Sequence, residues 1–480
     1  MKFLTLLFIF LSTNVFANSL LTQWAQDPEA FKFKLPEHQG AESFKSIPSA
    51  SDKIKLRNKL FNLDSSHKAE LPARENAAYL LELSQLINRP EEMEKLNLLE
   101  GRAERTPWSD DYWPIYAGIL GKRYSDPMFA YKDNWFENHQ YILDVPARQV
   151  FATGDLVKIN QLSPSEKYDL LVGDDQFSLT SKMWSEGKPY WDRYGEVESW
   201  MGICHGWAPA SIQELRPQSA VKVKDYNQAH DITFYPADIK ALASLLWANA
   251  RYDQRFIGSR CNLQEPEEDE DGRTTTPECF DNNPAAWHLT VVNGMGVHKR
   301  SFVFDATYDY QVWNQPLVSY RFSFFNPQTL KEGVTFKEAV VEKLDFGNDK
   351  FKKYRSSKMA KVVGVEMSIE YAVEVGPEAV LFEGENFDRS ISVSYLYDLE
   401  LDESGQIIGG EWYQNAHPDF IWSPTLNTMA ESPYDAYVQG SWSSQGPVPA
   451  QWKKAAAASS KRGLPLRKVV QKLIESSRQR

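Results

Sequence analysis

Cysteine is scarce in this chain, which has three cysteines among 480 residues. None of them forms a CxxC pair, and the sequence contains neither an HExxH segment nor a Walker-type glycine-rich loop. The commoner zinc sites and phosphate-binding loops therefore have no support in the sequence. Beyond its first residues, the chain has no apolar run that approaches the ~18 consecutive residues of a membrane-spanning helix.

Basic residues are also fewer than acidic residues. The chain has 53 Lys and Arg residues against 65 Asp and Glu residues, and its formal net charge is −12. An acidic protein is a poor match for a phosphate backbone, so we expect no nucleic-acid partner. A hydrophobic content of 42% and an aromatic content of 13% are instead sufficient for a large folded core.

The first 17 residues have the pattern of a secretory signal peptide. Lys2 precedes a short apolar segment, and Val15-Phe16-Ala17 is a small-residue cleavage pattern. Polar residues at 12–14 interrupt the apolar segment too early for a membrane span. We therefore expect a periplasmic or secreted protein without a membrane span.

An odd number of cysteines in an oxidising compartment leaves at least one thiol to explain. Cys261 and Cys279 flank the polar segment NLQEPEEDEDGRTTTPE, which cannot form a core of its own and would be stabilised by a local disulfide. Cys204 would then be the free thiol. A bridge between Cys204 and one of the other two cysteines is the alternative, because connectivity cannot be read from a sequence.

Cys204, in SWMGICHGWAPAS, is either a buried small hydrophobe or a nucleophile, depending on whether a base reaches it. His288 lies in AWHLTVV, which has the composition of a buried strand, and SFVFDAT predicts a second strand that ends in Asp305. A β-hairpin with residues 295–298 as its loop would place the Asp305 carboxylate opposite the His288 imidazole. This arrangement predicts a catalytic triad of Cys204, His288 and Asp305. The alternative is a core histidine that the aspartate satisfies.

These segments resemble a known family. WMGICHGWAPAS, AWHLTVVN and FVFDATYDYQVWNQP are similar to the transglutaminase elicitor family of oomycetes and some bacteria, in the transglutaminase-like branch of the papain-like superfamily. VWNQP, residues 312–316, resembles the surface peptide by which plants recognise the oomycete members. TPWSDDYWPIY, LSPSEKYDLLVGD and GGEWYQNAHPDFIW extend the resemblance over roughly residues 105–425.

The resemblance implies a protein-glutamine γ-glutamyltransferase whose triad is Cys204, His288 and Asp305. Its partners would be a protein glutamine donor and an amine or lysine acceptor, and Ca²⁺ would be its one possible cofactor. The chain departs from the pattern at His205, where better known transglutaminases have tryptophan, and at Gly206 and Pro209, which would break the long helix that a papain-like nucleophile opens. A cysteine hydrolase with the same triad, acting as deamidase or protease, and a non-catalytic surface or binding protein stay as alternatives.

Two other acidic or histidine-containing segments need a functional and a structural interpretation. The acidic run 265–271 could bind Ca²⁺, but it lacks EF-hand spacing and is more typical of a solvated loop. His417 and Asp419, in HPDF, could orient a substrate or bind a cation. Such a motif is more often a loop whose own polar atoms satisfy it.

The pattern of elements predicts an α+β fold with a papain-like or transglutaminase-like core and a mostly antiparallel sheet. Ser163, Pro164 and Glu166 have the spacing of a capping box, and Pro236 begins a second helix that extends through Trp247. Strand patterns follow between residues 391 and 422.

We expect four segments along the chain. They are the signal peptide (1–17), an N-terminal helical region that is a cap or a pro-segment (18–104), the catalytic domain (105–446) and a C-terminal tail (447–480). Within the N-terminal region, residues 74–87 have a helical pattern. Within the tail, residues 466–474 predict a short amphipathic helix with basic residues around its apolar face. We expect this helix to dock on the protein, and contact with an anionic surface is the alternative.

Overall fold

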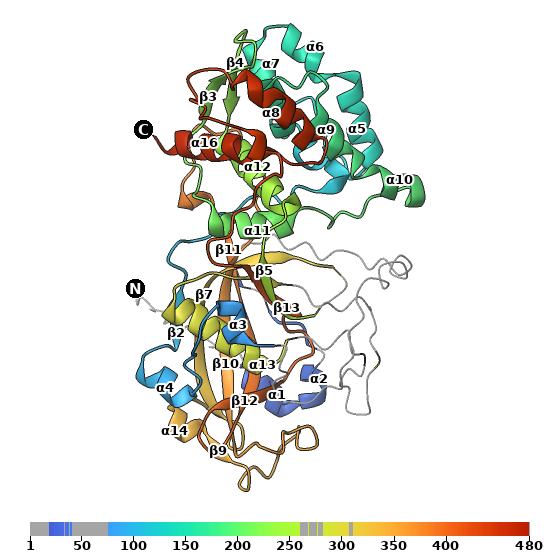
Figure 1. Ribbon diagram of the computed structural model, residues 1–480. Helices are drawn as coiled ribbons and strands as arrows, with labels where there is room; N and C mark the ends of the chain where they lie inside the picture. Colours follow the sequence, from blue (N-terminus) through green and yellow to red (C-terminus); the bar gives the residue numbers. More distant parts are fainter. Residues whose placement is uncertain are drawn as a thin grey trace, which may run out of the picture.

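The computed structural model describes residues 19–32, 34–37, 39–40, 75–259, 282–306 and 311–479, together with the single residues 267 and 276. The chain forms a helical lobe and a second lobe built on an antiparallel sheet, which lie at the top and the bottom of Figure 1. The expected signal peptide and the expected Cys261–Cys279 disulfide lie outside the described residues. Within the described ranges, no helix is both long and apolar enough to cross a membrane.

The sheet lobe contains eleven strands, and every described pairing between them is antiparallel. The main order across the sheet is β1 (Gln39–Gly40), β11 (Ser390–Leu401), β10 (Lys361–Ala372), β7 (Asn314–Asn326), β6 (Val303–Asp305), β13 (Phe420–Pro424) and β5 (Gln254–Gly258). Off this path lie β2 (Glu100–Arg102) and β8 (Lys331–Val334) beside β7, β9 (Val341–Glu342) beside β10, and β12 (Ile407–Trp412) beside β11. The expected α+β class with a mostly antiparallel sheet is confirmed.

The long central strands form because apolar and polar residues alternate along them. In β7, Tyr320, Phe322 and Phe324 are buried, whereas the intervening Arg321 and Ser323 are exposed. The strands expected between residues 391 and 422 are present as β11, β12 and β13. This alternation buries one face of the sheet in the core of the lobe.

Among the described residues, six helices accompany the sheet lobe. They are α1 (Leu20–Gln26), α2 (Pro28–Lys32), α3 (Ala77–Leu81), α4 (Pro90–Lys95), α13 (Pro284–Val291) and α14 (Phe336–Ala339). The helix expected over residues 74–87 is shorter, because Glu82 adopts a left-handed conformation that ends α3. Leu80, Leu81 and Met93 are buried in the core of the sheet lobe, so this part of the N-terminal region packs as an integral layer.

The strand predicted for AWHLTVV is wrong, because these residues lie in α13. The side chain of Asn283 caps the helix by accepting a hydrogen bond from the N–H of Ala285, and Pro284 takes the first helical position. All eight residues of α13 are buried, so its sequence lacks the apolar and polar periodicity that distinguishes a helix from a buried strand. A π-helical turn, Val292–Val297, follows where the hairpin was expected.

The helical lobe surrounds the buried helix α12 (Pro236–Asn249). Its other helices are α5 (Trp135–Asp144), α6 (Ala147–Ala152), α7 (Leu156–Asn160), α8 (Pro164–Val172), α9 (Ser178–Ser185), α10 (Lys188–Tyr194), α11 (Cys204–Gln213), α15 (Lys453–Ser460) and α16 (Arg467–Arg478). A small hairpin of β3 (Val221–Lys224) and β4 (Asp231–Phe234) completes it. The capping box at Ser163 and the helix start at Pro236 are as predicted.

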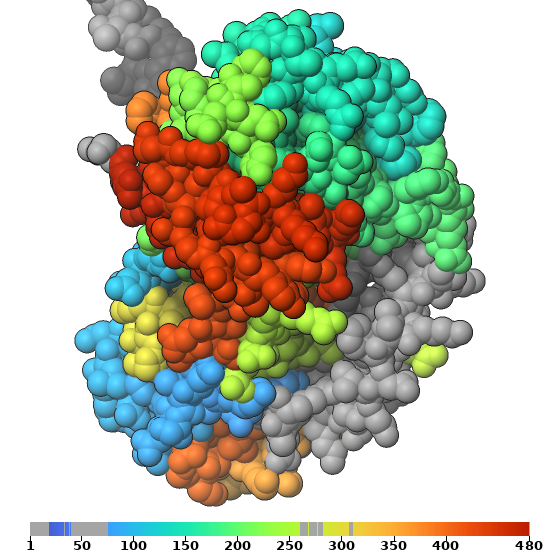
Figure 2. All heavy atoms as spheres, turned by 45° about the horizontal axis from the view of Figure 1, so that its top comes forward, coloured from blue at the N-terminus to red at the C-terminus, as the bar shows by residue number. Residues whose placement is uncertain are grey.

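The C-terminal tail docks on the helical lobe, as expected from its apolar face. Leu466, Val469, Val470, Leu473 and Ile474 are buried in the same cluster as the apolar residues of α12. In Figure 2 the red C-terminal segment covers a broad face beside the turquoise helices. The tail is therefore part of the core of this lobe.

Candidate active site

Cys204 is the first residue of α11, the helix that lies between the two lobes in Figure 1. The expected break at Gly206 and Pro209 is wrong, because α11 continues through both residues to Gln213. Pro209 removes one helical hydrogen bond without ending the helix. At Gly206, a Cβ would lie 2.3 Å from the carbonyl oxygen of Ser244, so glycine permits the close approach of α11 to α12.

The thiol of Cys204 is free and buried, with 5% of the residue exposed. Its Sγ lies 3.6 Å from the carbonyl oxygen of Val312, to which the S–H group donates. The side-chain amide of Asn314 donates to the same sulfur, with Nδ2 3.7 Å from Sγ. Both partners belong to the VWNQP segment, which the fold therefore places against the candidate nucleophile.

The side chain of Asn314 is held by a second residue. The indole Nε1 of Trp422 donates to Oδ1 of Asn314 over 2.9 Å. Because an indole N–H can only donate, its partner must be the amide oxygen, and the NH₂ group is left to face the sulfur. This contact defines the orientation of the amide.

Two carboxylates act on the thiol from the sheet side. Asp305 ends β6 opposite Asn314 and accepts a hydrogen bond from the backbone N–H of Trp313 over 3.0 Å. Glu374 follows β10 and accepts a hydrogen bond from Nε2 of Gln315 over 2.7 Å. Burial raises the pKa of Glu374 to about 7.

The electrostatic surroundings keep Cys204 in its thiol form. Burial raises the pKa of Cys204 to about 11, and the negative charges of Glu374 and Asp305 act in the same direction. Hydrogen bonds from Asn314 oppose this shift because they favour the thiolate. Burial and the two negative charges therefore favour the protonated form of the candidate nucleophile near neutral pH.

The structure brings Asp305 into the neighbourhood of Cys204, but it does not bring His288 there. His288 is fully buried in α13, where its Nδ1 lies 2.8 Å from the hydroxyl of Tyr397 and its ring contacts that of Phe322 with centroids 4.8 Å apart. Phe322 lies eight residues beyond Asn314 on β7. At a strand rise of ~3.3 Å per residue, this separation is about 26 Å along the strand.

The predicted hairpin between His288 and Asp305 is wrong for this reason. Asp305 pairs with Asn314 of β7, and the helix and π-turn at 284–297 replace the first strand of the hairpin. Burial lowers the pKa of His288 to about 3, so the imidazole is neutral near pH 7. His288 therefore has the environment of a core histidine.

Two further histidines were singled out by the sequence. His205 is exposed beside Cys204 on α11, and successive residues of a helix do not face each other. His417 stacks on Trp412, with ring centroids 4.8 Å apart and an interplanar angle of 11°. The imidazole of His417 is therefore packed against an aromatic ring of β12, and the interpretation of HPDF as a loop satisfied by its own polar atoms stays a prediction.

Asn314 contacts Cys204, and the sequence did not single it out by itself as a candidate. It stood inside VWNQP, a segment that the sequence marked as distinctive. Its contact with Cys204 joins positions 110 residues apart, and no local periodicity signals such a contact.

Among the described residues, no group of three or more His, Cys, Asp or Glu side chains is arranged to hold a metal ion. The acidic run 265–271, the segment considered for Ca²⁺, lies outside the described residues except for Glu267.

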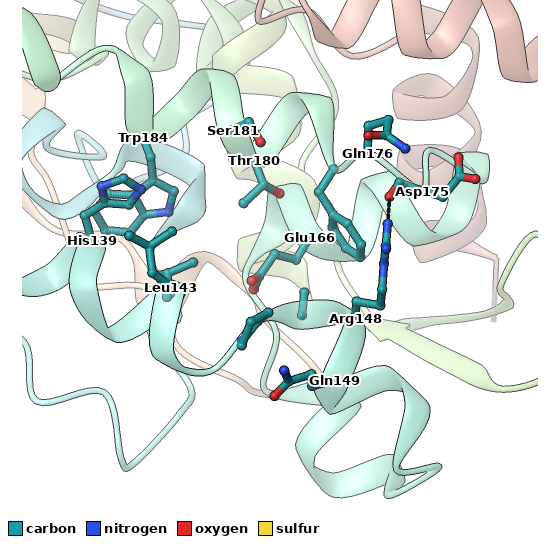
Figure 3. A pocket seen from close by; sticks show the side chains of 14 residues that line it. His139, Leu143, Arg148, Gln149, Glu166, Asp175, Gln176, Thr180, Ser181 and Trp184 are labelled. Atoms are coloured by element: carbon teal, nitrogen blue, oxygen red, sulfur yellow. Dashed lines mark hydrogen bonds between the residues drawn. The ribbon is translucent and has the colours of Figure 1, made fainter.

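Two surface cavities lie away from Cys204. One, of about 360 Å³, is in the helical lobe, where Figure 3 shows His139 stacked on Trp184 and Arg148 directed toward the backbone of Asp175. The other, of about 410 Å³, adjoins α3 and α4, and its lining includes Ser84 and Arg89. Neither is lined by Cys204 or by a residue of the VWNQP segment.

Comparisons with known proteins bear on the region around Cys204. Residues 192–435 match the model of the transglutaminase elicitor family, and this range contains α11, β6, β7 and β13. The fold is similar to the crystal structure of the GP42 transglutaminase from Phytophthora sojae, with a TM-score of 0.50 and 20% sequence identity, over 81% of this chain and 99% of that chain. No curated protein sequence matches significantly. The resemblance noted in the sequence is confirmed.

Proposed function

Because the chain belongs to the transglutaminase elicitor family, we propose that it transfers the acyl group of glutamine side chains to primary amines, with Cys204 as the nucleophile. The observation that carries this proposal is the position of Cys204. A free thiol opens a helix between two lobes, with an amide donor and two carboxylates around it. A thiol whose proton is taken by a neighbouring base can form a covalent acyl intermediate.

The reaction proceeds in two steps. The thiolate of Cys204 attacks the side-chain amide carbon of glutamine, a C–S bond forms, the C–N bond breaks and ammonia leaves with the proton that the thiol gave up. A primary amine then attacks the thioester, a new C–N bond forms, the C–S bond breaks, and the proton that the amine loses returns Cys204 to its thiol form. The backbone N–H of Cys204, at the start of α11, has no partner within the helix and serves as one donor to the developing oxyanion.

Glu374 accepts the thiol proton in this proposal. Its pKa of about 7 matches proton transfer near neutral pH, and its charge acts on the Cys204 thiol. His288, the base of the triad expected from the sequence, has a structural role here, because its imidazole is bonded to Tyr397 in another part of the sheet lobe. Asp305 is retained as a positioning residue, which holds the backbone of Trp313 beside Asn314.

The acyl acceptor is an amine in preference to water. Cys204 and Asn314 are buried, and exclusion of water protects a thioester from hydrolysis. We therefore propose a protein glutamine as donor and a lysine side chain or another primary amine as acceptor.

The test is amine incorporation by the purified protein. Wild-type protein, given a glutamine-containing protein and a labelled primary amine with and without Ca²⁺, should incorporate the label, and Cys204→Ala should abolish incorporation. His288→Gln is the matched control and should retain most of the activity per folded molecule. Ammonia release without incorporation would replace the transferase with a deamidase, and the absence of both products would overturn the enzymatic proposal.

Export also belongs to this proposal. The pattern of residues 1–17 supports cleavage after Ala17 and release into an oxidising compartment. N-terminal sequencing of the exported protein should begin at Asn18, and non-reducing peptide mapping should join Cys261 to Cys279. A retained N-terminus or free thiols at these two cysteines would contradict it.

A further inference from the structure

We propose that Asn314 is a catalytic residue, whose side-chain amide and the backbone N–H of Cys204 together stabilise the oxyanion of the acyl-transfer reaction. The inference rests on the proposed function and names a second donor for the same site. It follows from the position of one amide group, from the residue that orients it and from the absence of another side-chain donor among the described contacts of the sulfur.

The position of Nδ2 fits an oxyanion donor. It lies 3.7 Å from Sγ, and a substrate carbon bonded to Sγ would place its oxygen between the sulfur and the surrounding donors. Oxyanion donors act at ~3 Å from that oxygen, a distance that a group just beyond bonding contact with the sulfur can reach. The carbonyl of Val312 also contacts Sγ but has no hydrogen to donate, and the remaining described donor to the sulfur is the backbone N–H of Asn314 itself.

The orientation of the amide is set before substrate binds. Trp422 donates to Oδ1 of Asn314, and both side chains are buried. Rotation of the amide would leave the indole N–H of Trp422 facing an NH₂ group, which costs a buried hydrogen bond. A donor held in this way needs no reorganisation when charge develops on the oxygen.

Pairing between strands also fixes the position of the backbone that carries the Asn314 amide. Asn314 pairs with Asp305 at the start of β7, and Trp422 pairs with Val303 on the other side of β6. Three adjacent strands therefore determine where Nδ2 points. No proton moves through Asn314, because its hydrogen bond only strengthens as the oxygen becomes negative in each of the two steps.

The experiment compares two reactions of the same thiol. Acyl transfer from glutamine passes through an oxyanion, whereas alkylation by iodoacetamide does not. Asn314→Ala should lower kcat for amine incorporation by about 100-fold or more, while the limiting alkylation rate at high pH should stay within about threefold of the wild-type rate, because the thiol is fully ionised there in both proteins. Asn386→Ala, an exposed substitution, is the matched control.

Trp422→Phe sharpens the test, because it keeps an aromatic ring in the core and removes only the group that orients Asn314. We expect a smaller loss of kcat than for Asn314→Ala, of about tenfold, again with little change in alkylation. This variant also carries the test if Asn314→Ala does not fold.

Each outcome is decisive. Equal losses in acyl transfer and in limiting alkylation would show that Asn314 acts on the sulfur or on the fold, and would overturn the inference. Unchanged acyl transfer in both variants would do the same while leaving the proposed function intact. A wild-type protein that is alkylated at Cys204 but yields neither amide product nor ammonia would overturn the proposed function itself.

Discussion

Strand β7 contacts two buried titratable side chains, those of Cys204 and His288, at two different places along its length. At its start, Asn314 contacts Cys204, and eight residues further along, Phe322 contacts the ring of His288. Cys204 is surrounded by an amide, a carbonyl and two carboxylates, whereas His288 lies among aromatic rings with one hydroxyl as its partner. Burial shifts the pKa of each group toward its neutral form, but polar neighbours that suit chemistry are found only around the cysteine.

The largest effect predicted from this comparison concerns the reactivity of Cys204. At pH 8, iodoacetamide should alkylate Cys204 about 100-fold more slowly in the native protein than in the guanidinium-unfolded chain. Burial raises the pKa of the thiol from 9.0 to about 11, and each unit reduces the thiolate about tenfold below that pKa. Timed quenching and peptide mass spectrometry measure the rate, and equal rates in both states would contradict the described environment.

The next effect concerns acid stability and His288. Burial lowers the pKa of His288 from 6.5 to about 3, so between these values the unfolded chain binds a proton that the folded protein does not. The contribution of this neutral histidine is complete above pH 6.5 and is lost as the pH falls toward 3. The free energy of unfolding of wild type relative to His288→Gln should therefore fall by about 2.5 kcal/mol between pH 7 and pH 4.5, as measured by urea titration. If this difference in the free energy of unfolding did not change with pH, the imidazole of His288 would be exposed to solvent and not buried.

Glu374 provides a test near the start of β7, where polar groups surround Cys204. Glu374→Gln removes a negative charge that raises the pKa of Cys204, so alkylation at pH 8 should become faster, by about tenfold. Acyl transfer should become slower in the same variant, because the proton acceptor is gone. Glu378→Gln, on an exposed side chain, is the control and should change neither rate. If the alkylation rate and the acyl-transfer rate changed in the same direction, Glu374 would not be the proton acceptor.

The smallest predicted effect is on stability, and it concerns the part of β7 where aromatic rings surround His288. Tyr397→Phe deletes the hydroxyl that bonds Nδ1 of His288 and should lower the free energy of unfolding by about 1 kcal/mol. Alkylation of Cys204 should not change, because the two residues adjoin different parts of β7. Altered reactivity at Cys204 would show that the two ends of the strand are coupled.

Several local elements could be predicted because their signals are short-range. Ser163 and Glu166 form the expected capping box, and Pro236 begins the expected helix. The alternating strands after residue 390 and the apolar face of the tail also form where the sequence placed them. In each case, the residues that produce the signal are neighbours along the chain or on one face of one element.

The candidate site could be predicted only in part. Cys204 was identified from the odd number of cysteines and from its unusual surroundings, and Asp305 was correctly placed at the end of a strand. His288 was misplaced because a fully buried run of β-branched and aromatic residues has the same composition in a helix as in a strand. The cap at Asn283 and Pro284 was the local signal for the helix.

The sequence by itself determined the family, the free cysteine considered as a nucleophile and the alternation that makes the sheet antiparallel, because each depends on residue types at short spacing. Only the tertiary structure decided what surrounds that cysteine. Asn314 and Glu374 act on Cys204 from strands or strand ends that are distant in sequence, and Trp422 orients Asn314 from a third strand. His288 lies elsewhere, in the helix α13. The physical reason is that pairing between strands sets these contacts, and the register of a strand is specified by the packing of a whole face, which no single segment contains.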